Sequence, residues 1–399
     1  LNQARISFNR FANTTSVLTP FSLANLGGNF PQFGPATPPA LTVSGRMTLG
    51  NTSASPSRVV SQSMQGDENL SVTHGRHALK MGAEYLRLLY VNRTYFQTQG
   101  GFSFTGTFTG NPAADFILGK AQTLSVASPV LEQAGVQNNV FAFFQDDWRI
   151  SNRLTLNLGA RYEIALPWYE PHDLWGTFRP GTQSVVYPGA PAGLIYPGDP
   201  GIPRGLVSNN WNNLGPRVGF AWDVFGTGRT ALRGGYGIYF DQLDANIIQN
   251  TGQPFRYSYT FGAPYSLSNP LLGQAPIPTA VNTKNPIFVG TQQIIYPDPN
   301  LRTPYLQQFN LDLQQQWMSN VLIDVAYVGK IGHKLLIGLD ANPALYAPGA
   351  TLANENARRI YKGFGQNQIL STIGNSDYNG LQFQATKRYS RNFTLQGSY

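Results

Sequence analysis

The segment Val140–Ile164 reads VFAFFQDDWRISNRLTLNLGARYEI, and its second half alternates strictly between apolar and polar residues. Successive side chains of a β-strand point to opposite faces, so a period of two places the two sets on opposite sides. The segment therefore predicts a strand with one apolar and one polar face, which follows an earlier strand after a tight turn at Ile150–Arg153. The apolar set is Leu154, Leu156, Leu158, Ala160, Tyr162 and Ile164, and the polar set is Thr155, Asn157, Gly159, Arg161 and Glu163.

Four further segment pairs repeat this pattern. Each pair encloses a short turn that carries Gly, Ser or Asn, the residues that tolerate hairpin backbone angles. The chain thus predicts five β-hairpins. They are Asn69–Thr73 with His77–Asn92, Val140–Trp148 with Leu154–Ile164, Arg217–Val224 with Thr230–Asp241, Tyr305–Trp317 with Val321–Val328, and Leu381–Arg388 with Phe393–Tyr399.

Long Pro- and Gly-rich connections separate the hairpins, for example Pro167–Asn213, Gln242–Leu301 and Gly332–Asn375. Such lengths are unusual in a compact soluble domain. Short turns at one end and long loops at the other are typical of a bacterial outer-membrane barrel. We therefore expect an all-β, antiparallel transmembrane β-barrel in the outer membrane, of which about 10–12 strands are present, with long extracellular loops. Unequal loops without a repeated blade motif argue against a propeller or solenoid.

The composition agrees with this class. Charged residues make up 12% and aromatic residues 13% of the 399 residues, with 42 Gly and 28 Pro. No apolar run approaches the roughly 18 residues of a membrane-spanning helix. A mean hydropathy of −0.22 suits a soluble protein but also a barrel, because half of each strand faces water.

Aromatic residues recur just before the short turns, at Trp148, Trp222, Trp317 and Tyr389. Tyr305 lies twelve residues before Trp317 on the same strand face. At about 3.3 Å per residue and a tilt near 45°, this separation spans roughly 28 Å, close to the apolar band of a barrel. We expect these five residues at the membrane interfaces. Packing in the core of a soluble sandwich is the alternative.

The strand Val140–Trp148 leaves its facing open. Either Phe141 and Phe143, or Ala142, Phe144 and Trp148, could form its lipid face, and a β-bulge would change the answer.

Charged residues occupy the polar faces of the predicted hairpins. We expect Asp223 near Arg233 and Arg217 near Asp241, as ion pairs in a wet barrel interior. Their structural role would be to polarise the lumen and seat a plug; a role in a substrate path is the second hypothesis. The complete set of expected lumen-facing charges is Lys80, Glu84, Arg161, Glu163, Arg217, Asp223, Arg233 and Asp241.

No pattern indicates catalysis, a metal site or a cofactor. The four histidines lack ligand spacing, Asp146 and Asp147 are adjacent and so point to opposite strand faces, and Gly226–Gly228 is not followed by a helix. The absence of Cys excludes thiolate sites and disulfides. The net charge of +8 comes from 21 Arg and 7 Lys that are dispersed without a binding motif, so we expect no nucleic-acid partner.

Six segments together resemble the barrel of Oar-like TonB-dependent outer-membrane receptors, whose members typically begin with a carboxypeptidase-regulatory-like domain. The resemblance runs from about residue 69 to the end, and residues 1–66 match more loosely. The segments are HALKMGAEYLR, NPAADFILG, FFQDDWRISNRLTLNLGARYE, NNLGPRVGFAWDVFGTGRTALRGGYGIYFDQ, TPYLQQFNLDLQQQW and VAYVGKIGHKL.

This resemblance implies a barrel of about 22 strands closed by an internal plug, with energy from the inner-membrane TonB complex. The chain begins at Leu1 without a signal peptide and ends at Tyr399 inside a predicted strand. We therefore expect residues 1–399 to be part of the barrel domain, without plug, signal peptide or terminal strands, and not to form a stable pore alone.

The expected function is energised uptake of a large substrate, with outer-membrane lipid, the TonB complex (through the missing N-terminal part) and an unknown extracellular ligand as partners. A passive porin or a structural or adhesion barrel is the runner-up, and a soluble extracellular β-protein the third alternative.

Overall fold

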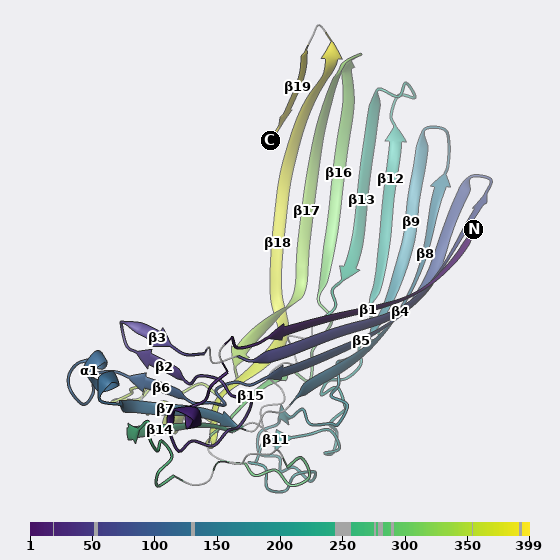
Figure 1. Ribbon diagram of the computed structural model, residues 1–399. Helices are drawn as coiled ribbons and strands as arrows, with labels where there is room; N and C mark the ends of the chain where they lie inside the picture. Colours follow the sequence, from purple (N-terminus) through teal and green to yellow (C-terminus); the bar gives the residue numbers. More distant parts are fainter. Residues whose placement is uncertain are drawn as a thin grey trace.

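A curved sheet of 12 strands makes up most of the molecule (Figure 1). The computed structural model describes residues 1–399 except 19, 52–54, 129–131, 244–256, 275–276, 278–281, 289–290, 353 and 391–392. The large sheet consists of β1 (Asn2–Thr15), β4 (Ser57–His74), β5 (His77–Thr94), β8 (Gln133–Arg149), β9 (Leu154–Ala165), β12 (Leu214–Asp223), β13 (Thr230–Phe240), β16 (Tyr305–Met318), β17 (Val321–Asp340), β18 (Phe364–Ser390), β15 (Gln292–Pro297) and β19 (Phe393–Ser398).

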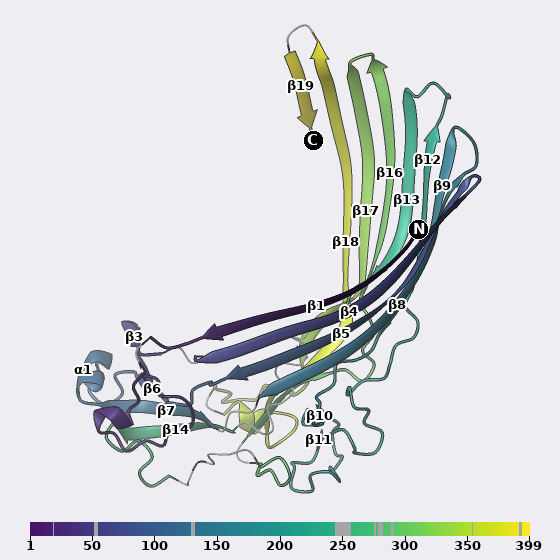
Figure 2. The same ribbon diagram turned by 45° about the vertical axis from the view of Figure 1, so that its right-hand side comes forward.

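The strand order follows the chain almost throughout: β1-β4-β5-β8-β9-β12-β13-β16-β17-β18, with β15 and β19 both on β18. Neighbours are antiparallel except β15, which runs parallel to β18. The antiparallel all-β class and the expected number of strands are confirmed. The sheet is not closed, because β1 pairs with β4 on one side and the opposite end of the sheet lies at β18 with β19 (Figure 2).

All five predicted hairpins form, but several strands are longer than the sequence pattern predicts. β4 begins at Ser57 rather than Asn69, and β1 pairs with it from Asn2 to Thr15. These segments carry polar residues on both faces, so they show no apolar–polar alternation in the sequence. Their extended conformation is held by backbone hydrogen bonds to the neighbouring strands.

The predicted loop Gly332–Asn375 is wrong at both ends, since β17 continues to Asp340 and β18 starts at Phe364. The first part of β18 is rich in Gly, Asn and Ser, as a loop would be. It is extended because it pairs with β17 as far as Asp340 opposite Gln368.

The short turns gather at one end of the sheet and the long connections at the other (Figure 1). Three of the long connections fold together into a second, five-stranded sheet in the order β14-β7-β6-β2-β3. Its elements are β2 (Ala40–Val43), β3 (Met47–Leu49), β6 (Gly101–Phe104), β7 (Lys120–Ser128) and β14 (Tyr257–Ser266), with the helix α1 (Pro112–Ile117). We call this unit the loop domain.

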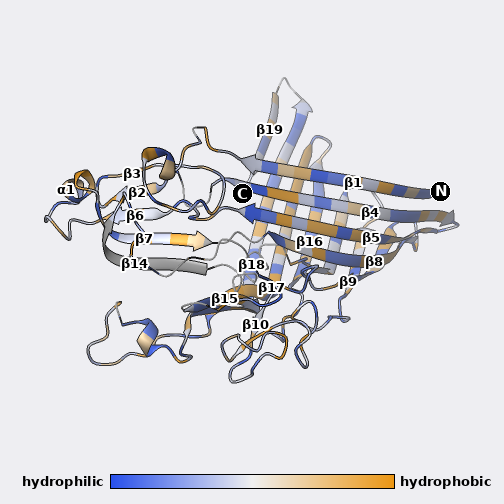
Figure 3. Cartoon of the chain, turned by 60° about the horizontal axis from the view of Figure 1, so that its bottom comes forward, coloured by the Kyte–Doolittle hydropathy of each residue, from blue (hydrophilic) through white to orange (hydrophobic). Residues whose placement is uncertain are grey.

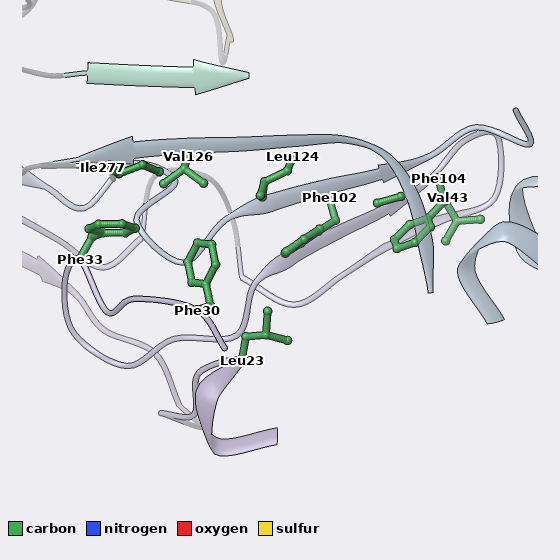
Figure 4. Packing of buried hydrophobic residues seen from close by; sticks show 10 residues of the cluster. Leu23, Phe30, Phe33, Val43, Phe102, Phe104, Leu124, Val126 and Ile277 are labelled. Atoms are coloured by element: carbon green, nitrogen blue, oxygen red, sulfur yellow. The ribbon is translucent and has the colours of Figure 1, made fainter. Parts of the chain in front are cut away.

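The loop domain has a hydrophobic core of its own (Figure 4). Phe102, Phe104 and Leu124 are fully buried there, and Phe116 of α1 packs edge-on against Phe104. The helix α1 begins with an Asn111 cap, whose side chain accepts the N–H of Ala113. The loops are thus more ordered than their Pro- and Gly-rich composition predicts.

The connection between β9 and β12 forms a second loop layer with the region around β15. It contains the short antiparallel pair β10 (Thr177–Phe178) and β11 (Leu194–Ile195). Two short 3-10 helices lie in other connections: η4 (Asn356–Arg358) between β17 and β18, and η1 (Ala24–Leu26) between β1 and β2. Two apolar clusters hold this layer, one around Tyr196 and Phe364 and one around Trp168 and Trp175.

Asp199 organises the second loop layer. Its carboxylate accepts the backbone N–H groups of Val185 at 2.7 Å, Val186 at 3.0 Å and Tyr196 at 2.8 Å, and the hydroxyl of Ser184 at 2.8 Å. Burial raises the pKa of Asp199, but these hydrogen bonds to the charged form outweigh it and hold the pKa below 3.8.

The first prediction concerns the core of the loop domain. Replacing Phe104 with Ala removes a fully buried ring and should destabilise the loop domain by about 3–5 kcal/mol. Limited proteolysis of the purified protein should then cut within residues 101–128, while the large sheet stays resistant. The control Phe108→Ala, at a ring that is 37% exposed, should behave like the wild type. A Phe104→Ala protein that is as resistant as the wild type would contradict this role.

The second prediction concerns pH. Because the folded pKa of Asp199 is lowered, its stabilising contribution is complete above the unfolded value of 3.8 and is lost as the pH falls through the folded pKa. Hydrogen exchange in residues 184–199 should therefore accelerate as the pH drops below about 4, after correction for the intrinsic rate. Asp199→Asn should exchange fast at neutral pH and lose most of this pH dependence. An unchanged acid profile in Asp199→Asn would show that another group is responsible.

Candidate functional site

The large sheet has one apolar and one polar face, and the strand register determines which residues share a face. Leu158 of β9 lies opposite Val218 of β12, which in turn lies opposite Tyr236 of β13. The neighbouring residues Asn157, Gly219 and Gly235 form the matching row on the other face. Apolar and polar residues accordingly alternate along the strands (Figure 3).

The apolar face has no protein cover in the described part of the chain. Phe144 is 48% exposed, Val218 51%, Leu311 50% and Trp317 68%. Contiguous exposure on this scale marks a surface that contacts something apolar. The buried hydrophobic clusters, by contrast, lie in the loops.

The register resolves the facing of β8. Val140 pairs with Ile164, Phe144 with Ala160 and Trp148 with Leu156, so these residues belong to the apolar face. Phe141 and Phe143 lie opposite Glu163 and Arg161 on the polar face. No register shift separates β8 from β9, so the bulge considered for this strand is not needed.

The aromatic residues expected at the membrane interfaces all lie on strands of the large sheet. Trp148, Trp222, Trp317 and Tyr389 stand at the short-turn end of β8, β12, β16 and β18, and Tyr305 begins β16 at the loop end. Trp148 also stacks on the imidazole of His77, with ring centroids 5.3 Å apart. Their depth in a membrane remains a prediction.

An ion-pair network occupies the polar face beside β8 and β9. The Arg161 guanidinium lies 3.0 Å from a Glu163 carboxylate oxygen and 3.6 Å from that of Glu84. It also stacks over the Phe141 ring at 4.7 Å. Residues of three strands, β5, β8 and β9, therefore contact the Arg161 guanidinium. The alternation in the sequence predicts that Arg161 lies on the polar face, but it does not predict the contact with Phe141.

Nearer the short-turn end, Lys80 lies 4.0 Å from Asp147, whose carboxylate also accepts the Asn157 amide at 2.7 Å. The polar face thus carries paired charges along β5, β8 and β9.

Two predicted ion pairs are wrong. Arg233 pairs with Asp312 of β16 at 3.9 Å, because the register puts it directly opposite that residue. Asp223 instead accepts the N–H groups of Gly226 and Gly228 at 3.0 and 2.9 Å, and so holds the β12–β13 turn. The sequence predicts a partner for Arg233 within its own hairpin, β12–β13, whereas its partner lies on β16, in the next hairpin.

Arg217 does not pair with Asp241. Its guanidinium stacks on the Tyr239 ring at 4.6 Å, and within the described residues no carboxylate lies within 4.0 Å of it. Asp241 lies past the end of β13 and lines a separate small hollow of about 60 Å³ among the loops. Gly237 allows the Arg217 stack, since a Cβ at that position would lie 2.9 Å from the Tyr239 ring.

A hollow of about 420 Å³ opens over the polar face around Arg161 and Arg217. Four glycines leave the space, and polar side chains of β9 and β16 border it. Its lining includes Gly159, Gly219, Gly235, Gly237, Asn157, Gln308, Asn310 and Tyr239. The arrangement can hold water and a polar solute, with Arg217 as the cation that has no carboxylate partner in the described residues.

The loop aromatics serve mainly as packing. Trp168 and Trp175 are buried in one cluster, and the Trp168 indole N–H donates to the Leu243 carbonyl at 2.9 Å. The side chains of Tyr257, Tyr259 and Tyr265 lie outside the described residues.

Within the described residues no group of three His, Asp or Glu side chains is placed to hold a metal ion. No helix in the described part of the chain is long and apolar enough to cross a membrane.

These features define a transmembrane β-barrel wall of the bacterial outer membrane. The model of the outer membrane beta barrel domain matches residues 1–399, and the chain belongs to that family.

Individual relatives are distant. The TonB-dependent transporter Oar of Myxococcus xanthus is 28% identical over 162 residues, which is 41% of this chain and 12% of Oar. The outer membrane transporter YddB of Escherichia coli has a similar fold, with a TM-score of 0.50 and 12% identity over 97% of this chain and 37% of YddB. The ferric enterobactin receptor PfeA of Pseudomonas aeruginosa has a TM-score of 0.47 and 9% identity over 100% of this chain and 40% of PfeA. The chain thus spans well under half the length of these relatives.

Proposed function

We propose that this chain is part of the wall of a TonB-dependent outer-membrane receptor, which imports a large substrate with energy from the inner-membrane TonB complex. The observation that carries the proposal is the polar hollow over β9, β12 and β13, with Arg217 exposed in it. The likeness to Oar supports the transporter class. An oligosaccharide, a siderophore or a peptide would suit the polar lining.

The free edges of the sheet support the partial-barrel hypothesis. Unpaired backbone groups are not tolerated in lipid, so β1 and the β18–β19 side require further strands before the wall can stand in a membrane. In this proposal seven residues of the lumen-facing set line the interior, and the eighth, Asp241, lies among the loops. The seven are Lys80, Glu84, Arg161, Glu163, Arg217, Asp223 and Arg233.

The long connections would face the cell exterior and make first contact with ligand. The loop domain and the second loop layer then form an ordered entrance to the barrel rather than a set of flexible loops, because each has a buried hydrophobic core.

The third prediction separates a receptor from a passive porin. The full-length protein, purified from outer membranes, should retain the C-terminal domain of TonB from the same organism in a pull-down and should show no steady conductance in planar bilayers. The physical reason is that a plug blocks the lumen until TonB acts on it. Steady ohmic conductance without TonB binding would identify a passive porin instead.

The fourth prediction tests the hollow as a substrate path. Arg217→Ala and Arg233→Ala should each lower uptake several-fold, because they remove cations from the polar face. Uptake would be measured with a labelled oligosaccharide, a ferric siderophore and an oligopeptide. Arg76→Ala, in the short turn between β4 and β5 and away from both the hollow and the long connections, is the control. If both variants import every probe at the wild-type rate, the path lies elsewhere.

A further inference from the structure

A second hollow, of about 310 Å³, lies at the loop end of the apolar face. The strands β12, β13 and β16 supply its largely apolar floor, and loop residues together with Lys334 of β17 border it. The floor residues are Leu214, Ile238, Phe240 and Tyr305, with the polar Gln307 beside them, and the polar rim consists of Asn210, Asn212, Asn213, Arg302, Thr303 and Lys334.

The register places the floor on the outward side of the wall. Phe240 lies opposite Tyr305, and Ile238 opposite Gln307, in the same alternation as Tyr236 and Phe309. This hollow therefore lies on the opposite face from the one around Arg217, where the wall meets lipid and the long loops begin.

A β-bulge turns Lys334 toward this side. Between Gly332 and Leu335, three steps along β17 match two along β18, from Ser376 to Gly374. Lys334 occupies the irregularity with a φ of 56°, a left-handed conformation that is uncommon for Lys. Strand alternation from His333, which pairs with Tyr305, would send Lys334 to the polar face; instead its ammonium lies 5.6 Å from the Tyr305 ring.

Arg302 supplies the second cation of the rim. Its backbone N–H donates to the Thr372 hydroxyl at 3.0 Å, which fixes the start of the segment that leads into β16. Among the residues that the structure describes, neither Arg302 nor Lys334 has a carboxylate within 4.0 Å. Two cations beside an apolar floor are thus left for an external anion.

The amide side chains of the rim are held in place. Asn210 donates to Asn213 at 2.7 Å, and both donate to the Thr303 hydroxyl at 3.1 Å. Asn212 is exposed beside them. Preorganised amides bind hydroxyl groups with little loss of side-chain entropy.

We propose that this hollow binds the phosphorylated sugar headgroup of a glycolipid in the outer leaflet. Arg302 and Lys334 bind the phosphate, Asn210 and Asn212 bind sugar hydroxyls over the buried Asn213, and the apolar part of the floor receives the start of an acyl chain. The proposal rests on the proposed orientation of the wall, with its long connections outward.

Native mass spectrometry of the detergent-solubilised full-length protein tests the site. The probes are rough lipopolysaccharide, phosphatidylglycerol and inorganic phosphate. Wild type should retain lipopolysaccharide at least about tenfold more tightly than the double variant Arg302→Gln/Lys334→Gln, since two charge-assisted contacts are lost. In a protein that keeps Arg302, Lys334→Gln should weaken lipopolysaccharide binding. Lys334→Arg, which keeps the positive charge, should retain most of it.

The matched control is Lys330→Gln, four residues away on the polar face opposite Gln308, which should bind lipopolysaccharide normally. A heat-modified gel shift shows that each variant is folded. Equal lipopolysaccharide binding by the double variant overturns the site; equal retention of phosphatidylglycerol, or of phosphate alone, overturns the sugar headgroup. TonB binding is expected in every variant, so its loss would count against the receptor function rather than this site.

Discussion

Inside a lipid bilayer every backbone N–H and C=O group needs a partner within the protein, because no water is present to supply one. The ladder from β1 to β18 meets this requirement along most of its length, apart from its two edges and the bulges in β16 and β17. The register is consequently rigid, and a slip of one residue would move every apolar side chain of a strand to the polar face. The positions of the charges, the aromatics and both hollows depend on this ladder.

The two faces of the sheet place different demands on side chains. On one face, Phe144, Val218 and Leu311 remain exposed because lipid, not protein, covers them. On the other, glycines leave space beside the wall, and Arg161 of β9 pairs with Glu163 of the same strand and with Glu84 of β5, two strands away. The buried hydrophobic clusters of the described chain are instead found in the loops, where protein packs against protein.

Strict alternation made β9 and the neighbouring hairpins predictable from sequence, and with them the class of fold and the face of Arg161 and Arg217. β1 and the first half of β18 carry no such pattern, since long-range pairing alone holds them extended. The partner of Arg233 was missed for the same reason, because Asp312 becomes its neighbour only through the pairing of two separate hairpins. The loop domain could not be predicted because its core is formed by three segments that are distant in the sequence. The orientation of Lys334 could not be predicted because a β-bulge interrupts the strand alternation there.

The alternation of lipid and water contact along β9 tests the central claim most directly. The chain contains no Cys, so single substitutions Asn157→Cys and Leu158→Cys give unique sites for a spin label in the full-length protein, reconstituted into bilayers. The account predicts that oxygen, which dissolves in lipid, relaxes the label at 158 strongly, and that a water-soluble nickel complex relaxes the label at 157. Equal accessibility of both labels to both relaxing agents would contradict it.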